Sequence, residues 1–183
     1  LNGTNPEQFY PMDVSDFKKE LNLEGKFVLL CLSRLVHRKG VDLVMQSVQQ
    51  LKKEMPNLYL LVVGDGPSAK SLKELSAELE LNEYARFVGK VKHEMLNSYY
   101  NVSDVFCLPA RAVYPDVEGF GIVFLEANAA GKPVIGSATG GIPSAVVDGE
   151  TGFLIPENDI DALSDKIRIL YKNAELCTQL GQH

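Results

Sequence analysis

The sequence predicts an α/β domain with a doubly wound, Rossmann-like parallel sheet and helices on both faces of the sheet. Three observations support this fold class. Short apolar runs alternate six times with amphipathic stretches along the 183 residues. The runs at 26–33 and 58–63 are apolar almost throughout, which is typical of strands buried on both faces. The stretch 159–173 places Ile160 and Leu163 on an apolar stripe with helical spacing, opposite its charges.

Each element follows from its local pattern. Strands are expected at 26–33, 58–63, 85–88, 104–108, 133–136 and 152–155. Helices are expected at about 40–55, 68–80, 92–101, 121–130, 141–147 and 159–173. Ligands bind beyond the carboxyl ends of the strands in such a sheet, so a site is expected in the segments that follow the strands.

Composition narrows the classes of function. Hydrophobic residues make up 45% and charged residues 23%, as in a globular domain. The net charge of −6 and the pI near 5.1 argue against nucleic acid as a main partner, because phosphate binding needs a surplus of Lys and Arg. No apolar run approaches the ~18 residues of a membrane span. The chain begins at Leu1, so we expect it to be part of a longer protein.

The cysteines and histidines favour neither a disulfide framework nor a metal site. Cys31, Cys107 and Cys177 are odd in number and widely spaced, which favours a reducing compartment. Cys31 and Cys107 lie in apolar strands and are expected to be core thiols. The three histidines have no partners at ligand spacing, so no bound metal is expected.

A basic segment follows the first strand. Arg34, Arg38 and Lys39 lie within six positions of an otherwise acidic chain. Arg34 and Lys39 could hold an anion of two or more charges, with Arg as a bidentate donor and Lys as a point charge. The alternative, a solvated basic loop before a helix, is about equally well supported by position alone.

A glycine-rich segment follows the second strand. Gly64-x-Gly66-x-x-Ala69 satisfies a dinucleotide-binding fingerprint, so an NAD(P)-binding domain is an alternative. However, the motif follows the second strand rather than the first, Pro67 offers no N–H to a phosphate, and the next strand ends without an acidic residue. A plain strand-to-helix turn is the favoured interpretation.

Two glutamates mark the region after the fourth strand. Glu126 falls in a nearly all-apolar helix, where an unpaired carboxylate would be costly, so it should have a partner such as the hydroxyls of a bound sugar. Glu118, on the preceding glycine-containing loop, could present a second carboxylate to the same cleft. The alternative is that Glu126 pairs internally with Arg34 or Lys39.

The segment E-G-F-G-I-V-F-L-E, from Glu118 to Glu126, resembles the E-x7-E motif of retaining glycosyltransferases with the GT-B fold. The similarity is strongest to glycosyltransferase family 4. The resemblance covers essentially the whole chain. It includes, in order, N-G-T-N-P-E-Q-F-Y-P, S-R-L-V-H-R-K-G, V-V-G-D-G-P, R-F-V-G-K-V, S-D-V-F-C-L-P, E-A-N-A-A-G-K-P-V-I, G-G-I-P and V-D-G-E-T-G-F-L-I. It implies that residues 1–183 are one half of a GT-B fold, the carboxyl-terminal domain that binds the nucleotide-sugar donor.

The resemblance also implies roles for individual residues. Arg34 and Lys39 would grip the donor diphosphate, and Glu126 would accept hydrogen bonds from the ribose hydroxyls. Glu118 would touch the transferred sugar near the anomeric centre, so the catalytic set would be Glu118, Arg34 and Lys39. The main chain around Val88 would contact the base. Backbone N–H groups would meet the sugar and its phosphate at Phe120, Gly121, Ile122 and Val123.

The implied enzyme transfers a sugar from a UDP- or GDP-sugar to an acceptor hydroxyl, in glycan or glycolipid synthesis, with retention of configuration and without metal or cofactor. Its partners would be the donor and its own amino-terminal acceptor domain, which lies outside this chain, so these residues alone would be inactive. The implied location is cytoplasmic, at most peripheral to the inner face of a membrane. A non-catalytic binding module of the same fold is a further alternative.

Overall fold

A six-stranded sheet forms the centre of the protein in a computed structural model that describes residues 7–113, 119 and 121–182. All neighbouring strands are parallel, in the order β3-β2-β1-β4-β5-β6. The order reverses beside β1, which confirms the predicted doubly wound sheet. The strands are β1 (Phe27–Leu32), β2 (Leu58–Val63), β3 (Ala85–Gly89), β4 (Val105–Leu108), β5 (Val134–Ser137) and β6 (Gly152–Ile155).

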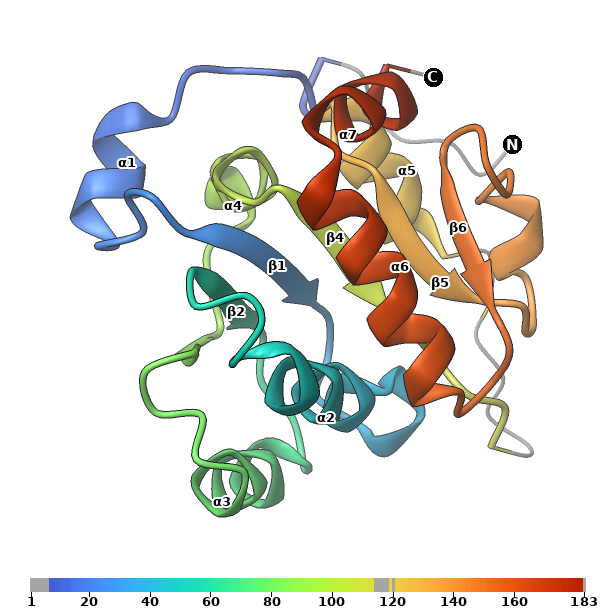
Figure 1. Ribbon diagram of the computed structural model, residues 1–183. Coiled ribbons are helices and arrows are strands. Elements are labelled where there is room, and N and C mark those ends of the chain that lie inside the picture. The colour runs from blue at the N-terminus through green and yellow to red at the C-terminus, as the bar shows by residue number, and fades with distance from the viewer. Residues whose placement is uncertain (1–6, 114–118, 120, 183) are drawn as a thin grey trace.

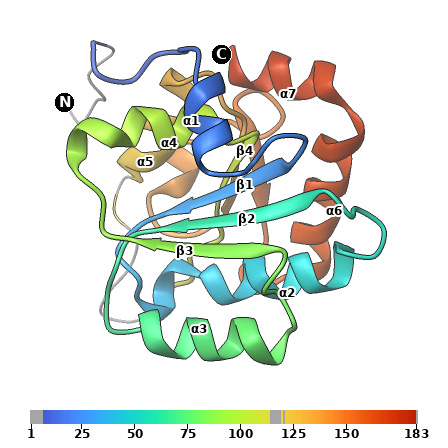
Figure 2. The same cartoon turned by 90° about the vertical axis from the view of Figure 1, so that its left-hand side faces the viewer.

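Helices cover both faces of the sheet, as predicted (Figures 1 and 2). One face carries α2 (Val41–Leu51), α3 (Ala69–Glu78), α6 (Ile160–Lys172) and α7 (Ala174–Gly181). The other face carries α1 (Ser15–Glu20), α4 (Leu96–Val102) and α5 (Ile122–Ala129). Short 3-10 helices are η1 (His37–Lys39), η2 (His93–Met95) and η3 (Ile142–Ser144). Across the described residues, no helix combines the length and the apolar character needed to cross a bilayer.

Side chains of the strands contribute to two hydrophobic cores, one on each face of the sheet. In β1, Leu29 and Cys31 face the α2 side, whereas Val28 and Leu30 face the α4 side, and all four are fully buried. Double-sided burial is why the β1 and β2 sequences show no polar alternation. The prediction that Cys31 and Cys107 are core thiols is confirmed, and burial raises the pKa of both.

Three helical segments differ from the sequence prediction. The prediction of a helix at 141–147 is wrong, because only the 3-10 helix η3 forms there. Pro143 lies in its first turn, and two glycines precede it. Neither α1 nor α7 was predicted. The helix α1 buries none of its residues, so it leaves little apolar periodicity. In α7 only Leu180 and Gly181 are buried, at its very end.

Candidate functional site

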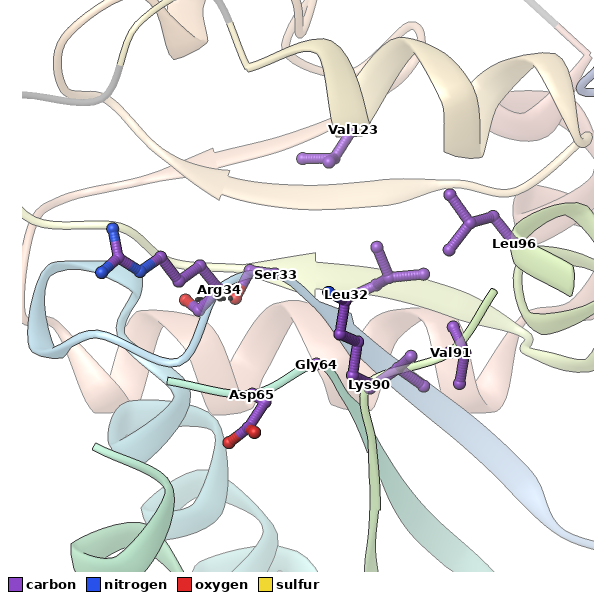
Figure 3. A pocket seen from close by; sticks show the side chains of 10 residues that line it. Leu32, Ser33, Arg34, Gly64, Asp65, Lys90, Val91, Leu96 and Val123 are labelled. Atoms are coloured by element: carbon purple, nitrogen blue, oxygen red, sulfur yellow. Dashed lines mark hydrogen bonds between the residues drawn. The ribbon is translucent and has the colours of Figure 1, made fainter. Parts of the chain in front are cut away.

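A cavity of about 480 Å³ opens at the carboxyl ends of β1, β2 and β3. This is the edge of the sheet where the sequence analysis expects a site. Loops after all three strands contribute to it, Val123 of α5 lies above it, and Leu96 at the start of α4 lies at one side (Figure 3). The residues that line it are Leu32, Ser33, Arg34, Val63, Gly64, Asp65, Lys90, Val91, Leu96 and Val123.

The two ends of the cavity differ in chemistry. Val91 and Leu96 form an apolar end, and Val123 of α5 covers the middle from above (Figure 3). Arg34 extends from the loop after β1 at the other end. Its side chain is exposed and makes no ion pair with any described residue. The cavity therefore offers a flat apolar ligand one surface and an anion another.

The loops after β1 and β2 are joined through their main chains. The N–H of Leu35 donates to the Asp65 carbonyl at 2.9 Å, and the N–H of Ser68 donates to the Leu35 carbonyl at 3.0 Å. A Cβ on Gly64 would lie 1.9 Å from the Ser33 carbonyl oxygen, and one on Gly66 would lie 2.4 Å from that of Leu35. The two glycines thus permit the loops to touch, which supports the turn interpretation over the dinucleotide fingerprint.

The start of α5 lies beside the cavity, which its residue Val123 lines. Gly121 precedes the helix with a φ of 72°, and a Cβ there would meet the Phe124 ring at 2.8 Å. Among the described residues no side chain caps this helix. The first N–H groups of a helix, here including those of Ile122 and Val123, have no acceptor within the helix. Glu118 and Phe120 lie outside the described residues.

Glu126 has an internal partner, but not one that the sequence suggests. The Tyr100 hydroxyl donates to Glu126 Oε2 at 2.7 Å across the α4–α5 contact. The interpretation that pairs Glu126 with Arg34 or Lys39 finds no support, since neither cation bonds to it. Burial and the neighbouring carboxylate hold the pKa of Tyr100 well above its usual range, so its hydroxyl stays a donor. Glu126 is partly buried and does not line the cavity.

The other predicted site residues lie at different depths. Lys39 ends η1, is only 9% exposed and is not among the residues that line the cavity. Val88 packs against the core on the α4 side, and its neighbours Lys90 and Val91 line the cavity instead. The resemblance implies contact with the base along Arg86–Val91, chiefly through main chain, and does not single out the Lys90 side chain, which directly follows β3. The described residues include no cluster of three His, Cys, Asp or Glu suited to a metal ion.

Asp65 is the one acidic residue among those lining the cavity. Its side chain points away from Val123 and α5 (Figure 3). Its Oδ1 accepts the N–H of Gly66 at 2.8 Å, an Asx-type contact within its own turn. One carboxylate oxygen is therefore engaged by the turn, and the two cations Arg34 and Lys90 leave the lining with a net positive charge.

Fold and cavity together define an α/β ligand-binding domain of the Rossmann type, with its site at the switch point of the sheet. The chain belongs to the glycosyl transferases group 1 family: the sequence model of that family matches residues 13–183. The resemblance seen in the sequence is thereby confirmed, as is the GT-B carboxyl-terminal domain fold.

Two known proteins illustrate the match. The chain is 34% identical over 166 residues to the GDP-mannose-dependent alpha-(1-6)-phosphatidylinositol monomannoside mannosyltransferase of Mycolicibacterium smegmatis, covering 90% of this chain and 44% of that protein. It is 33% identical to sucrose-phosphate synthase of Thermosynechococcus elongatus, with a TM-score of 0.86 over 98% of this chain and 44% of that one.

A second structure has a higher TM-score. Anabaena HepE, solved in complex with UDP, has a TM-score of 0.89 over 99% of this chain and 49% of that chain, at 23% identity. At that identity the likeness establishes the fold alone. The chain spans about half the length of these relatives.

Proposed function

We propose that this chain is the donor-binding domain of a retaining glycosyltransferase and that the cavity holds the nucleotide part of a nucleotide-diphospho-sugar. The observation that carries the proposal is the division of the cavity into an apolar end and a cationic end. A nucleoside diphosphate has the same division, with a flat base at one end and an anion at the other.

The base is assigned to the apolar end. Val91 and Leu96 form its wall, and the main chain of the β3 loop, near Val88, offers polar groups at its edge. The diphosphate is assigned to Arg34, with Lys39 as the second cation, while Lys90 lies in the middle of the cavity beside Leu32 (Figure 3). A charged hydrogen bond gains strength in a partly enclosed site, where water competes less for the phosphate oxygens.

Transfer of the sugar leaves negative charge on the departing diphosphate. Arg34, Lys39 and the N–H groups of Gly121, Ile122 and Val123 would stabilise that charge, and fixed donors of this kind are a main source of rate enhancement. Glu118 is assigned to the transferred sugar, near the anomeric carbon. These cationic and N–H groups supply the counter-charge without a metal ion.

The transfer step itself is assigned to the full-length protein. Orientation of an acceptor hydroxyl against the anomeric carbon supplies roughly 7–11 kcal/mol of such a barrier. The chain matches 44% of the length of the M. smegmatis mannosyltransferase, and the groups identified here all serve the donor. We therefore assign the acceptor to an amino-terminal domain outside these residues, and we expect this chain alone to bind donor without transferring its sugar.

Calorimetry with UDP, GDP and ADP, each free and as the sugar conjugate, tests the proposal. We expect one base to be preferred and its diphosphate to bind more tightly than its nucleoside. Tighter binding of NAD or NADP than of any nucleotide-sugar would favour a dinucleotide-binding domain. Failure to bind any nucleotide would favour a non-catalytic binding module of this fold.

Glu126 provides a separate test of the ribose assignment. Replacing Glu126 by Gln should weaken nucleotide binding about fivefold, because the amide still accepts one hydrogen bond but loses its charge. The 2′-deoxynucleotide should bind the wild type about as weakly as the nucleotide binds the variant. Its own affinity should be the same for wild type and variant. Calorimetry provides both affinities.

Tyr100 supplies the matched control for that test. Tyr100→Phe removes the hydroxyl that bonds Glu126 but leaves the carboxylate in place. If Glu126 serves only the α4–α5 contact, both variants will lower the stability of the fold and neither will change the preference for ribose over deoxyribose. That result would remove Glu126 from the site.

A further inference from the structure

Arg111 joins three loops at the carboxyl edge of the sheet. It follows β4, and its side chain is only 8% exposed. Its guanidinium makes a two-pronged ion pair with Asp42, at 3.1 Å to Oδ1 and 3.0 Å to Oδ2. Its Nε donates to Asn158 Oδ1, beyond β6, at 2.9 Å. One side chain therefore fixes the ends of β1, β4 and β6 relative to each other.

The contacts of Arg111 surround Lys39. Arg111 Nη1 donates to the His37 carbonyl at 3.1 Å, and the Arg111 backbone N–H donates to the Arg38 carbonyl at 2.8 Å. These are the two residues that precede Lys39 in η1, while Asp42 lies three residues after it. A single residue thus holds the main chain before Lys39 and a side chain three residues after it.

Close packing at Gly40 further restricts the main chain next to Lys39. Gly40 has a φ of 70°, and a Cβ on it would lie 2.0 Å from the Pro109 carbonyl oxygen. The 37–42 segment therefore rests directly on the chain that leads into Arg111. Because Lys39 is itself buried, a small shift of this segment would carry its ammonium with it.

A buried ion pair is a poor means of gaining stability, since the cost of desolvating both charges offsets much of their attraction. The geometry of the Arg111 guanidinium matters more than its contribution to stability. Its planar group of donors holds several acceptors at once, which a lysine in the same place could not do. We propose that Arg111 is a positioning residue for the donor site, which holds Lys39 where it meets the diphosphate. This inference rests on the proposed role of Lys39.

Binding of UDP and GDP, with uridine and guanosine as phosphate-free probes, tests the inference in a double-mutant cycle. Arg111→Lys should weaken binding of the preferred diphosphate about fivefold or more and leave its nucleoside unchanged. In a Lys39→Met background the same substitution should change diphosphate binding less than about twofold, because the group it positions is gone. A purely structural role would give equal effects in both backgrounds.

Two further variants keep the test decisive. Asp42→Asn keeps the shape but removes the charge that Arg111 grips, and it should reproduce the binding pattern if Arg111→Lys fails to fold. Arg168→Lys is the matched control, because Arg168 also pairs across elements, 3.1 Å from Glu54, but at the opposite end of α2 from Asp42. It should leave diphosphate binding unchanged whatever it does to the melting temperature.

The outcomes separate the two proposals. A full effect of Arg111→Lys in the Lys39→Met background, or equal weakening of nucleoside and diphosphate, overturns the positioning role alone. A wild type that binds diphosphate no better than nucleoside overturns the proposed function and the positioning role with it.

Discussion

Replacing Arg34 by alanine is expected to weaken binding of the preferred nucleoside diphosphate by roughly 10- to 150-fold, since a hydrogen bond to a charged group contributes about 1.5–3 kcal/mol. Arg34 is exposed at the cationic end of the cavity and makes no ion pair with a described residue, so its removal leaves no buried charge behind. Isothermal calorimetry measures the affinity, and binding of the matching nucleoside should change little.

Lys39 needs a different substitution because its side chain is buried. Lys39→Met keeps most of the alkyl volume while removing the charge, and we expect a loss of diphosphate affinity in the same range. Lys70→Ala is the control: it removes an exposed cation from α3 that, among the described residues, forms an ion pair with Glu74 alone, four residues further on. Equal losses for nucleoside and diphosphate at Arg34 and Lys39 would contradict their assignment to the diphosphate.

The strands β1 and β2 were predictable because their apolar runs are long and nearly uninterrupted. Burial on both faces removes polar residues from β1 and β2, so they differ sharply from the amphipathic helices between them. The short α1 and α7 gave no such signal, because packing at one or two positions rather than periodicity holds them. In α1, the ring of Phe17 lies 5.2 Å from that of Tyr99, which is far away in the sequence.

The position of the site followed from topology, but its internal partners did not. Arg34 lines the cavity because it directly follows β1. The Tyr100–Glu126 hydrogen bond spans 26 residues, and the Arg111–Asp42 ion pair spans 69. Nothing in the local sequence marks either pair. Only the packing of α4 on α5, and of one loop on another, brings these side chains together.

The largest loss of stability is expected from Gly64→Ala. Gly64 has a φ of 128°, which side chains rarely adopt, and its Cβ would lie 1.9 Å from the Ser33 carbonyl oxygen. Backbone strain and the forced movement of Ser33 together should lower the free energy of unfolding by about 4 kcal/mol. Urea denaturation followed by circular dichroism measures this change.

Gly149→Ala separates the contact from the backbone conformation. Gly149 also has a positive φ, of 79°, but a Cβ on it would have nothing within 4 Å, so its replacement should cost only about 1–2 kcal/mol. The folded Gly64 variant should also bind diphosphate less well, because Ser33 adjoins Arg34, whereas the Gly149 variant should bind normally. Equal losses of stability in the two variants, with diphosphate binding intact in both, would show that the β1 and β2 loops can separate without disturbing Arg34. The close contact at Gly64 would then have no part in shaping the cationic end of the cavity.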